Sequence, residues 1–302
     1  MSDRLLKFLF HGAPVRGELV HISEAWQQMT AHHDYPAPVK QLLGEMVAAA
    51  ALLASSIKFN GALVMQVHGD GPVKLLVVEV QPDLALRATA KLRDQPITDT
   101  ATMRELINRS GRGRFAITLD PRDPVPGQQP YQGIVPLDGD SMADVLETYM
   151  RQSEQVDTKL KLAADGRISA GMLLQRLPDQ GGVGVVTDED AWNRATMLGG
   201  TLSREELLQL APEAVMRRLY GQERLDPQAT LAPRFACRCS RERIGRMLIS
   251  LGRAEVDSII DEMKAVTVTC DFCNRQYSFD IVDVAQLFTS GDTGTESQAT
   301  RH

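Results

Sequence analysis

The sequence lacks an excess of positive charge and has no hydrophobic run long enough to cross a membrane. Its 302 residues carry 33 Lys and Arg against 39 Asp and Glu, which gives a formal net charge of −6. Such a chain has no overall basic field to attract nucleic acid or an anionic membrane surface. The longest apolar stretch, residues 46–57, is too short for a bilayer and predicts a buried helix. We therefore expect neither a membrane nor a nucleic acid as partner.

The N-terminal residues also lack the pattern of a secretory leader. Met-Ser-Asp-Arg-Leu-Leu-Lys contains neither a long apolar run nor a small-residue cleavage site. This predicts no signal peptide, and we expect a cytoplasmic protein. In a reducing cytosol, clustered cysteines bind metal or do redox chemistry more often than they form structural disulfides.

Motifs typical of enzymes are missing as well. We find no Ser/His/Asp set and no metallohydrolase motif. Gly111-Arg-Gly113 and Gly181-Gly-Val-Gly184 are not followed by Lys-Ser/Thr between a strand and a helix, so we interpret both as turns rather than phosphate loops. His32-His33-Asp34 has no second ligand cluster at metal spacing and predicts a helix end at the surface. The sequence therefore predicts a protein that is not an enzyme.

The first 178 residues predict one α+β domain, because the expected strands outnumber the helices and are not strictly interleaved with them. Apolar runs bounded by Gly, Pro and Asp indicate antiparallel strands. We expect strands at 5–10, 18–22, 62–67, 73–80, 84–92, 114–119, 131–137, 158–163 and 168–177. We expect helices at 23–32, with Ser23 as the N-cap, at 39–59 and at 141–152.

A break at 178–184 separates this domain from a helical region. Ser203-Arg-Glu-Glu206 is a capping box, Pro212 suits a first helical turn, and Gly221 can end that helix. These helices are short and charge-rich, so they should depend on docking against another part of the protein. The predicted organisation is an α+β core domain at 1–180, a metastable helical linker at 181–233, a small four-cysteine zinc domain at 234–289, and a disordered tail at 290–302.

All four cysteines lie close to the C-terminus, as Cys237-Arg-Cys239 and, thirty residues later, Cys270-Asp-Phe-Cys273. Zinc binds four thiolates at about 2.3 Å each, which places neighbouring sulfurs roughly 3.8 Å apart, and two close pairs can supply that shell. The second pair has ordinary zinc-ribbon spacing, whereas one intervening residue in the first pair is unusual. We predict one Zn²⁺ per chain, bound by Cys237, Cys239, Cys270 and Cys273.

Loss of that metal should unfold the small domain. Residues 235–288 contain few apolar side chains, and a core of this size is only marginally stable without a bound metal or a disulfide. Structural zinc contributes on the order of 10–16 kcal/mol in small fingers. A disulfide within either pair would close a tiny loop that constrains the unfolded chain little, and such a bond is labile. The residues thus permit a redox switch. They also permit an inert zinc in a nucleic-acid-binding regulator, which the six arginines from 234 to 253 favour.

The whole cysteine pattern, with its flanks, resembles the 33 kDa heat shock protein family of redox-regulated holdase chaperones. Matching segments around the cysteines are Cys237-Arg-Cys239-Ser-Arg-Glu-Arg243, Glu255-Val-Asp-Ser-Ile259 and Cys270-Asp-Phe-Cys273. Matching segments nearer the N-terminus are Val15-Arg-Gly-Glu-Leu-Val20, His33-Asp-Tyr-Pro36, Gly69-Asp-Gly-Pro72, Tyr131-Gln-Gly133 and Gly171-Met-Leu-Leu-Gln175. The resemblance covers nearly the whole chain.

The resemblance implies an ATP-independent chaperone that is folded and inactive when reduced and zinc-bound. Hypochlorite, or peroxide with heat, would convert the cysteines into the redox disulfides Cys237–Cys239 and Cys270–Cys273. Zinc would leave, the zinc domain would unfold, and the linker would lose its support. The exposed surface would then bind unfolded client proteins under oxidative stress, and the active form would be a homodimer.

Overall fold

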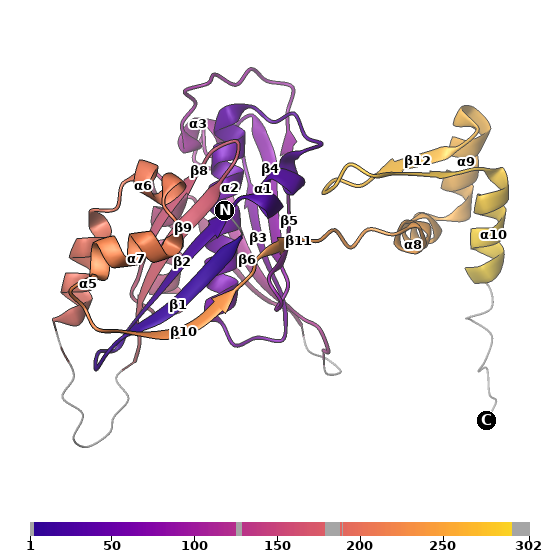
Figure 1. The fold of residues 1–302 in the computed structure, drawn as a ribbon. Coiled ribbons are helices and arrows are strands. Elements are labelled where there is room, and N and C mark those ends of the chain that lie inside the picture. Colours follow the sequence, from indigo (N-terminus) through magenta and orange to yellow (C-terminus); the bar gives the residue numbers. More distant parts are fainter. Residues whose placement is uncertain (1–2, 125–128, 179–187, 189, 292–302) are drawn as a thin grey trace, which may run out of the picture. The chain divides into compact units, whose positions relative to one another are not determined.

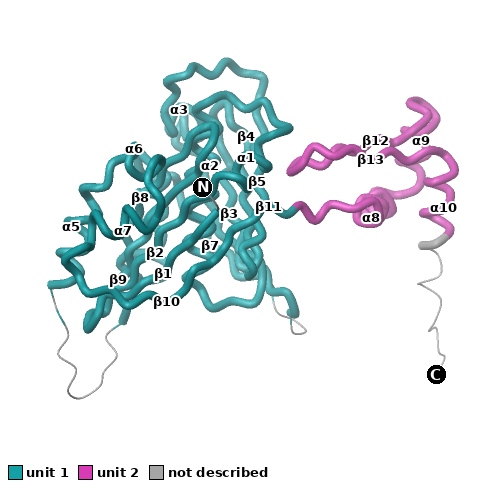
Figure 2. Tube along the Cα trace, in the orientation of Figure 1, with its two compact units in different colours: residues 1–236 teal, residues 237–302 magenta. Residues whose placement is uncertain are grey.

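The chain forms two compact units, residues 1–236 (unit 1) and 237–302 (unit 2), as Figure 2 shows. The computed structural model describes residues 3–124, 129–178, 188 and 190–291. The predicted glycine turn at 181–184 and residues 292–302 of the predicted tail lie outside the described residues.

Unit 1 contains two sheets (Figure 1). The five-stranded sheet is antiparallel throughout, in the order β10 (Leu225–Leu231), β1 (Arg4–Phe10), β2 (Val15–Ile22), β9 (Ser169–Arg176) and β8 (Thr158–Ala164). The six-stranded sheet has the order β11 (Arg234–Phe235), β5 (Ala85–Leu92), β4 (Val73–Val80), β3 (Gly61–His68), β6 (Arg114–Pro121) and β7 (Tyr131–Pro136). Its strands are antiparallel except for β11, which pairs with β5 in parallel.

The helix α2 (Ala37–Ser56) contacts strands of both sheets and supplies the centre of the main core. Residues 46–53 are buried on every side, which confirms the predicted buried helix. Gly44 allows α2 to lie close to β8 (Thr158–Ala164), since a Cβ at Gly44 would lie only 2.4 Å from the Cβ of Ala164. Within the described residues α2 alone has the length and apolar composition of a membrane span, and 72% of that window is buried inside unit 1, as in a core helix.

The opposite face of the five-stranded sheet is covered by α5 (Ala191–Gly200), α6 (Arg204–Gln209) and α7 (Pro212–Tyr220). Successive side chains along a strand point to opposite faces of the five-stranded sheet, so they join two different cores. Val20 and Ile22 join the core around α2, whereas Phe8, Phe10 and Leu19 join a second core beneath α5–α7. The remaining helices of unit 1 are α1 (Glu24–Thr30), α3 (Met103–Ile107) and α4 (Met142–Gln152).

The sequence predicts no strand after residue 177, whereas the described residues contain β10, β11 and a two-stranded hairpin in unit 2. Residues 225–231 were predicted as part of a helical segment, but they form β10 at the edge of the five-stranded sheet. Pro227 explains the difference, because proline interrupts a helix and is tolerated in an edge strand. It pairs with Phe8 where the register of β1 and β10 shifts.

Unit 2 is small and has its own core. It consists of α8 (Arg241–Leu251), α9 (Arg253–Met263), the hairpin of β12 (Val266–Thr269) and β13 (Gln276–Phe279), and α10 (Ile281–Gly291). The buried side chains are Leu248, Val256, Ile260, Val266, Phe279 and Val284. Mixed helices and sheets together with a small four-cysteine unit confirm the predicted fold class.

Candidate metal centre

The four cysteines of unit 2 lie in the segment that precedes α8 and in the turn between β12 and β13. Cys270 and Cys273 lie in the turn between β12 and β13, where the Cys270 carbonyl accepts a 2.9 Å hydrogen bond from the Asn274 amide. Asn274 adopts a left-handed conformation with φ of 57°, which lets the chain reverse just after Cys273. Cys237 and Cys239 precede α8, whose start is fixed by Ser240, the oxygen of which accepts from the Arg243 amide at 3.2 Å.

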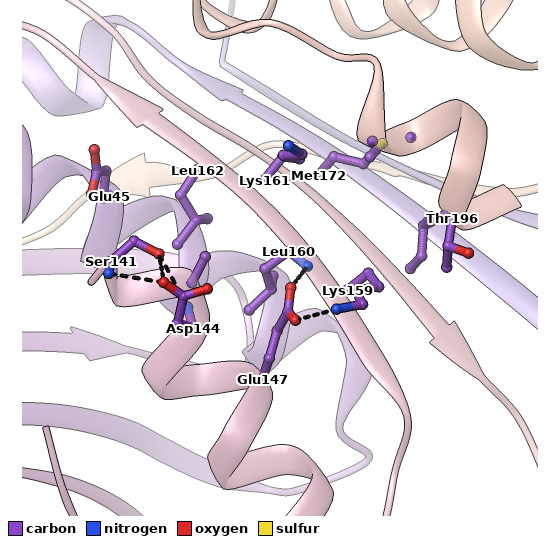
Figure 3. Close-up of a pocket in the computed structure, with 14 residues that line it drawn as sticks. Glu45, Ser141, Asp144, Glu147, Lys159, Leu160, Lys161, Leu162, Met172 and Thr196 are labelled. Atoms are coloured by element: carbon purple, nitrogen blue, oxygen red, sulfur yellow. Dashed lines mark hydrogen bonds and ion pairs between the residues drawn. The ribbon is translucent and has the colours of Figure 1, made fainter. Parts of the chain in front are cut away.

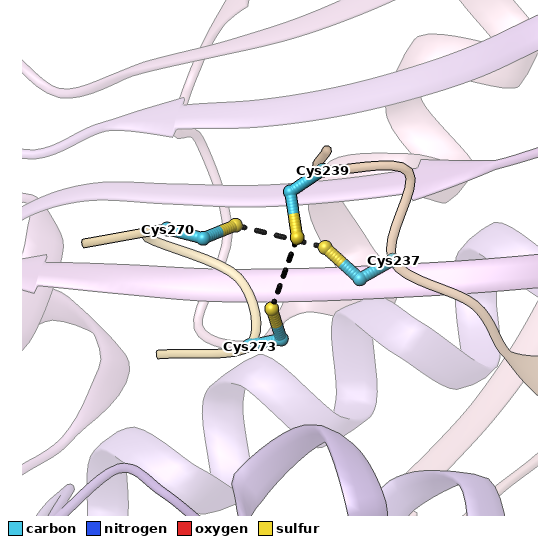
Figure 4. Close-up of side chains that lie close together, drawn as sticks. All are labelled: Cys237, Cys239, Cys270 and Cys273. Carbon is cyan, nitrogen blue, oxygen red and sulfur yellow. Dashed lines mark hydrogen bonds between the residues drawn. The ribbon is translucent and has the colours of Figure 1, made fainter. Parts of the chain in front are cut away.

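The four sulfurs point toward a common centre (Figure 4). All four lie within 4.8 Å of one another, with 3.4 Å between Cys239 and Cys273 and 3.6 Å between Cys237 and Cys270. A tetrahedral zinc with four thiolates requires sulfurs roughly 3.8 Å apart, whereas a disulfide requires about 2.05 Å. All four cysteines are free. The cluster could therefore hold one metal ion, and its all-sulfur donor set suits zinc.

The thiols do not share one electrostatic environment. Burial raises the pKa of Cys237 and of Cys273. Burial acts in the same direction on Cys239, but hydrogen bonds, first of all from the Tyr277 hydroxyl, lower the pKa of that thiol to about 7. The Tyr277 oxygen lies 3.1 Å from the Cys239 sulfur. Cys239 thus loses its proton more easily than Cys237 or Cys273, and a bound cation would favour the thiolate at every position.

We did not expect a contact between Tyr277 and the cysteines from the sequence. The side chain packs against the small core of unit 2, but its hydroxyl reaches Cys239, 38 residues earlier in the chain. The Arg275 guanidinium interacts with the same hydroxyl. A tyrosine in the strand that follows a Cys-X-X-Cys turn is the pattern that would have indicated this contact.

Three of the six arginines between 234 and 253 pair with carboxylates of their own unit. Arg241 contacts Asp283 at 2.7 Å and Arg253 contacts Asp257 at 3.3 Å in unit 2, while Arg234 pairs with Asp83 in unit 1. The Arg241 guanidinium also lies 4.2 Å from the centre of the Phe279 ring. These three arginines have structural partners, which weakens the interpretation of the basic run as a nucleic-acid-binding face.

The other regions considered from the sequence do not converge on a site. In the described residues the four cysteines form the one group of His, Cys, Asp and Glu side chains that could hold a metal. His33 stacks on Tyr35 with ring centres 4.9 Å apart. Gly111 has φ of 74°, which confirms a turn.

A cavity of about 450 Å³ in unit 1 lies between α4, β8 and α5 (Figure 3). Its charged groups support the fold. The Glu147 carboxylate accepts hydrogen bonds from the Lys159 ammonium at 2.7 Å and from the Leu160 amide at 2.8 Å. The Asp144 carboxylate accepts from Ser141 in the capping box of α4.

Comparison with known proteins places the chain in a family. Residues 3–280 match the family model described as Hsp33 protein. The chain belongs to the Hsp33 family. It is 48% identical over 291 residues to the 33 kDa chaperonin of Methylobacillus flagellatus, which covers 96% of both chains. It is 44% identical over 305 residues to the 33 kDa chaperonin of Azotobacter vinelandii, which covers 99% of both. The resemblance stated from the sequence is confirmed.

The fold agrees with that of an Hsp33 homologue. The crystal structure of the 33 kDa chaperonin from Thermotoga maritima superposes with a TM-score of 0.77 at 17% identity, covering 96% of this chain and 99% of that one. This likeness concerns the fold. The family and the names of the relatives support a chaperone.

Proposed function

We propose that this chain is an ATP-independent holdase chaperone that is held inactive by zinc in its reduced form and activated by oxidation. The observation that carries the proposal is the convergence of four free thiols in unit 2, beside a core of only a few buried side chains. Family membership supports the chaperone part. The all-cysteine cluster supports the redox part, because thiolates are both the ligands of zinc and the groups that oxidants attack.

The first step of the proposal concerns the metal. Cys237, Cys239, Cys270 and Cys273 would hold one Zn²⁺, which would tie the segment before α8 to the turn between β12 and β13. Zinc contributes on the order of 10–16 kcal/mol to small domains of this kind. A unit with so small a core should not remain folded without that contribution.

The second step is oxidation to the disulfides Cys237–Cys239 and Cys270–Cys273. All four sulfurs lie within 4.8 Å of one another, so the folded geometry leaves every pairing open, and the resemblance favours the two local bonds. A local disulfide closes a loop of three or four residues. It leaves the segment before α8 free to separate from the turn between β12 and β13. A bond between these two parts would instead preserve the fold of the hairpin region. Local pairing therefore couples oxidation to the unfolding of unit 2.

The third step exposes a surface for clients on unit 1. The helices α5, α6 and α7 are only 10, 6 and 9 residues long. Isolated helices of such lengths are not stable, so these depend on packing against the five-stranded sheet. Their detachment would expose apolar side chains of that sheet, namely Phe8, Phe10, Val15, Leu19, Met172 and Leu174. We propose that this face binds unfolded clients in the cytoplasm, and that the oxidised form is a homodimer.

The proposal is tested by following zinc and disulfides together. Reduced, zinc-loaded protein is treated with hydrogen peroxide at elevated temperature while a colorimetric chelator reports free zinc, and the product is mapped by non-reducing peptide analysis. We expect one zinc released per chain and two local disulfides. A dominant disulfide that joins Cys237 or Cys239 to Cys270 or Cys273 would contradict the coupling of oxidation to unfolding. Zinc that stays bound throughout oxidation would contradict the switch itself.

A further inference from the structure

The Tyr277 side chain connects the small core of unit 2 to the cysteine cluster. Tyr277 lies on β13 opposite Val268, and its ring packs against the buried side chains of the unit. Its hydroxyl extends from that core to the Cys239 sulfur at 3.1 Å. The strand therefore fixes both the direction and the reach of this hydrogen bond.

A hydroxyl in this position changes the chemistry of the sulfur that it contacts. In the reduced, metal-loaded form Cys239 is a thiolate, and a hydrogen bond to an ionised acceptor is stronger than one between neutral groups. The Arg275 guanidinium beside the phenol makes the hydroxyl a better donor, because neighbouring hydrogen bonds polarise one another. The bond withdraws electron density from the sulfur, and a less basic thiolate is intrinsically less nucleophilic.

We propose that Tyr277 is a positioning residue of the redox switch, whose hydroxyl holds the Cys239 thiolate in the metal site and slows its reaction with peroxides. This inference rests on the proposed function. The Tyr277 hydroxyl would then set how fast a given concentration of peroxide oxidises the cysteine cluster. Groups outside the ligand shell commonly set metal affinity and ligand orientation in this way.

The reaction that Tyr277 restrains is a two-electron oxidation of two thiolates. The Cys239 sulfur attacks one oxygen of hydrogen peroxide, the O–O bond breaks, hydroxide leaves, and Cys239 becomes a sulfenic acid. The Cys237 thiolate then attacks that sulfur, the disulfide forms, and a second hydroxide leaves. Two thiolates and one peroxide thus give one disulfide and two hydroxides. The hydrogen bond from Tyr277 stabilises the starting thiolate and is lost as its charge disappears.

The test compares three full-length variants with the wild type. Tyr277→Phe keeps the ring and removes only the hydroxyl. Ser278→Ala is the matched control, since it removes a hydroxyl from the adjacent residue of the same strand, where the Ser278 oxygen makes a 3.5 Å contact with Thr267. Arg275→Gln removes the charge beside the phenol. Reduced, zinc-loaded proteins are mixed with hydrogen peroxide in stopped flow while a chelator reports zinc release.

Tyr277→Phe should release zinc roughly fivefold faster than the wild type, as expected for the loss of one such hydrogen bond. Arg275→Gln should release zinc faster than the wild type by a smaller factor, and Ser278→Ala should match the wild type. A second readout uses the cobalt-loaded proteins. Loss of the hydrogen bond should move the thiolate-to-metal charge-transfer band of Tyr277→Phe to longer wavelength, which simple loosening of the fold does not predict.

Two results separate this inference from the proposed function. If the wild type releases zinc on oxidation but Tyr277→Phe matches Ser278→Ala in release rate and in the cobalt spectrum, the role of Tyr277 is refuted and the switch stands. If the wild type binds no zinc, or keeps its zinc through oxidation, the proposed function itself is refuted, whatever the result for Tyr277→Phe. Faster release by Tyr277→Phe with an unchanged cobalt spectrum would also refute the inference, because it would indicate that the hydroxyl supports the fold of unit 2 without changing the Cys239 sulfur.

Discussion

Each of the four cysteines contributes one sulfur to the cluster, so we expect each of them to be a zinc ligand. Replacing any one with serine should lower zinc affinity strongly, because three thiolates and a hydroxyl are a poor shell for the metal, and unit 2 should lose its folded structure. Zinc content is measured after competition with a chelator, with Ser258→Ala, on α9, as the control. A single variant that keeps zinc at wild-type affinity would remove that residue from the ligand set.

His21 gives the protein a predictable response to acid. The side chain is 2% exposed, on the face of β2 that α5–α7 cover, and burial lowers the pKa of its imidazole despite the opposing influence of the Leu208 backbone, Asp3 and Asp165. In the unfolded chain the imidazole therefore takes up a proton near the ordinary histidine pKa of about 6.5, whereas in the folded chain it does so only at lower pH. Stability should fall as the pH drops below that value, because protons then favour the unfolded state.

The measurement is the difference in melting temperature between pH 7.5 and pH 5.5. His21→Phe should lose less stability over this range than the wild type, since the titrating group is gone. His68→Phe, which replaces an exposed imidazole, should behave as the wild type does. An identical acid response in His21→Phe and the wild type would show that His21 does not contribute.

The convergence of the four cysteines could be predicted from the sequence because two close pairs of thiols suit one metal shell. Contacts between residues far apart in the chain could not. Ser23 was predicted to cap α1, yet its side chain makes no capping bond; the amides of Ser23, Glu24 and Ala25 are bound by the carboxylate of Asp3 instead. Tyr277 was missed for the same reason, because only folding brings its hydroxyl to Cys239.

At the scale of elements, local rules predicted the starts of α6 and α7 but not the edge strand β10. The capping box of Ser203 and Glu206 is present at the start of α6, and α7 begins at Pro212 as predicted. Both features depend on residues within one turn. Strand β10 depends on pairing with β1, more than two hundred residues earlier, and no local pattern indicates that partner.

The docking of α5–α7 provides a test at this scale. Leu219 on α7 is 5% exposed and packs in the core that the helices share with the five-stranded sheet, so Leu219→Ala should weaken docking by about 2–5 kcal/mol. The reduced, zinc-loaded variant should then suppress client aggregation partially. Met197→Ala is the control, because Met197 lies on α5 but is 74% exposed. An inactive but demonstrably loosened Leu219→Ala protein would contradict the assignment of the sheet face to clients.

At the scale of the whole molecule, the two units should respond differently to oxidation. Unit 1 has a large core around α2 that needs no metal, whereas unit 2 has few buried residues beside its thiols. Amide hydrogen exchange should therefore rise across 237–291 on oxidation, then across 191–220, while α2 and its sheets stay protected. Uniform loss of protection would indicate general damage, and unchanged exchange in 237–291 would contradict unfolding of unit 2.

The most direct test of the central claim is light scattering from an aggregating client. A chemically unfolded protein is diluted into buffer without ATP, with this protein either reduced and zinc-loaded or oxidised with its zinc released. We predict that the oxidised form suppresses scattering, that the reduced form does not, and that oxidised protein treated with reductant and zinc before it meets the client no longer suppresses it. Equal suppression by the reduced and oxidised forms, or none by the oxidised form, would contradict a redox-gated holdase.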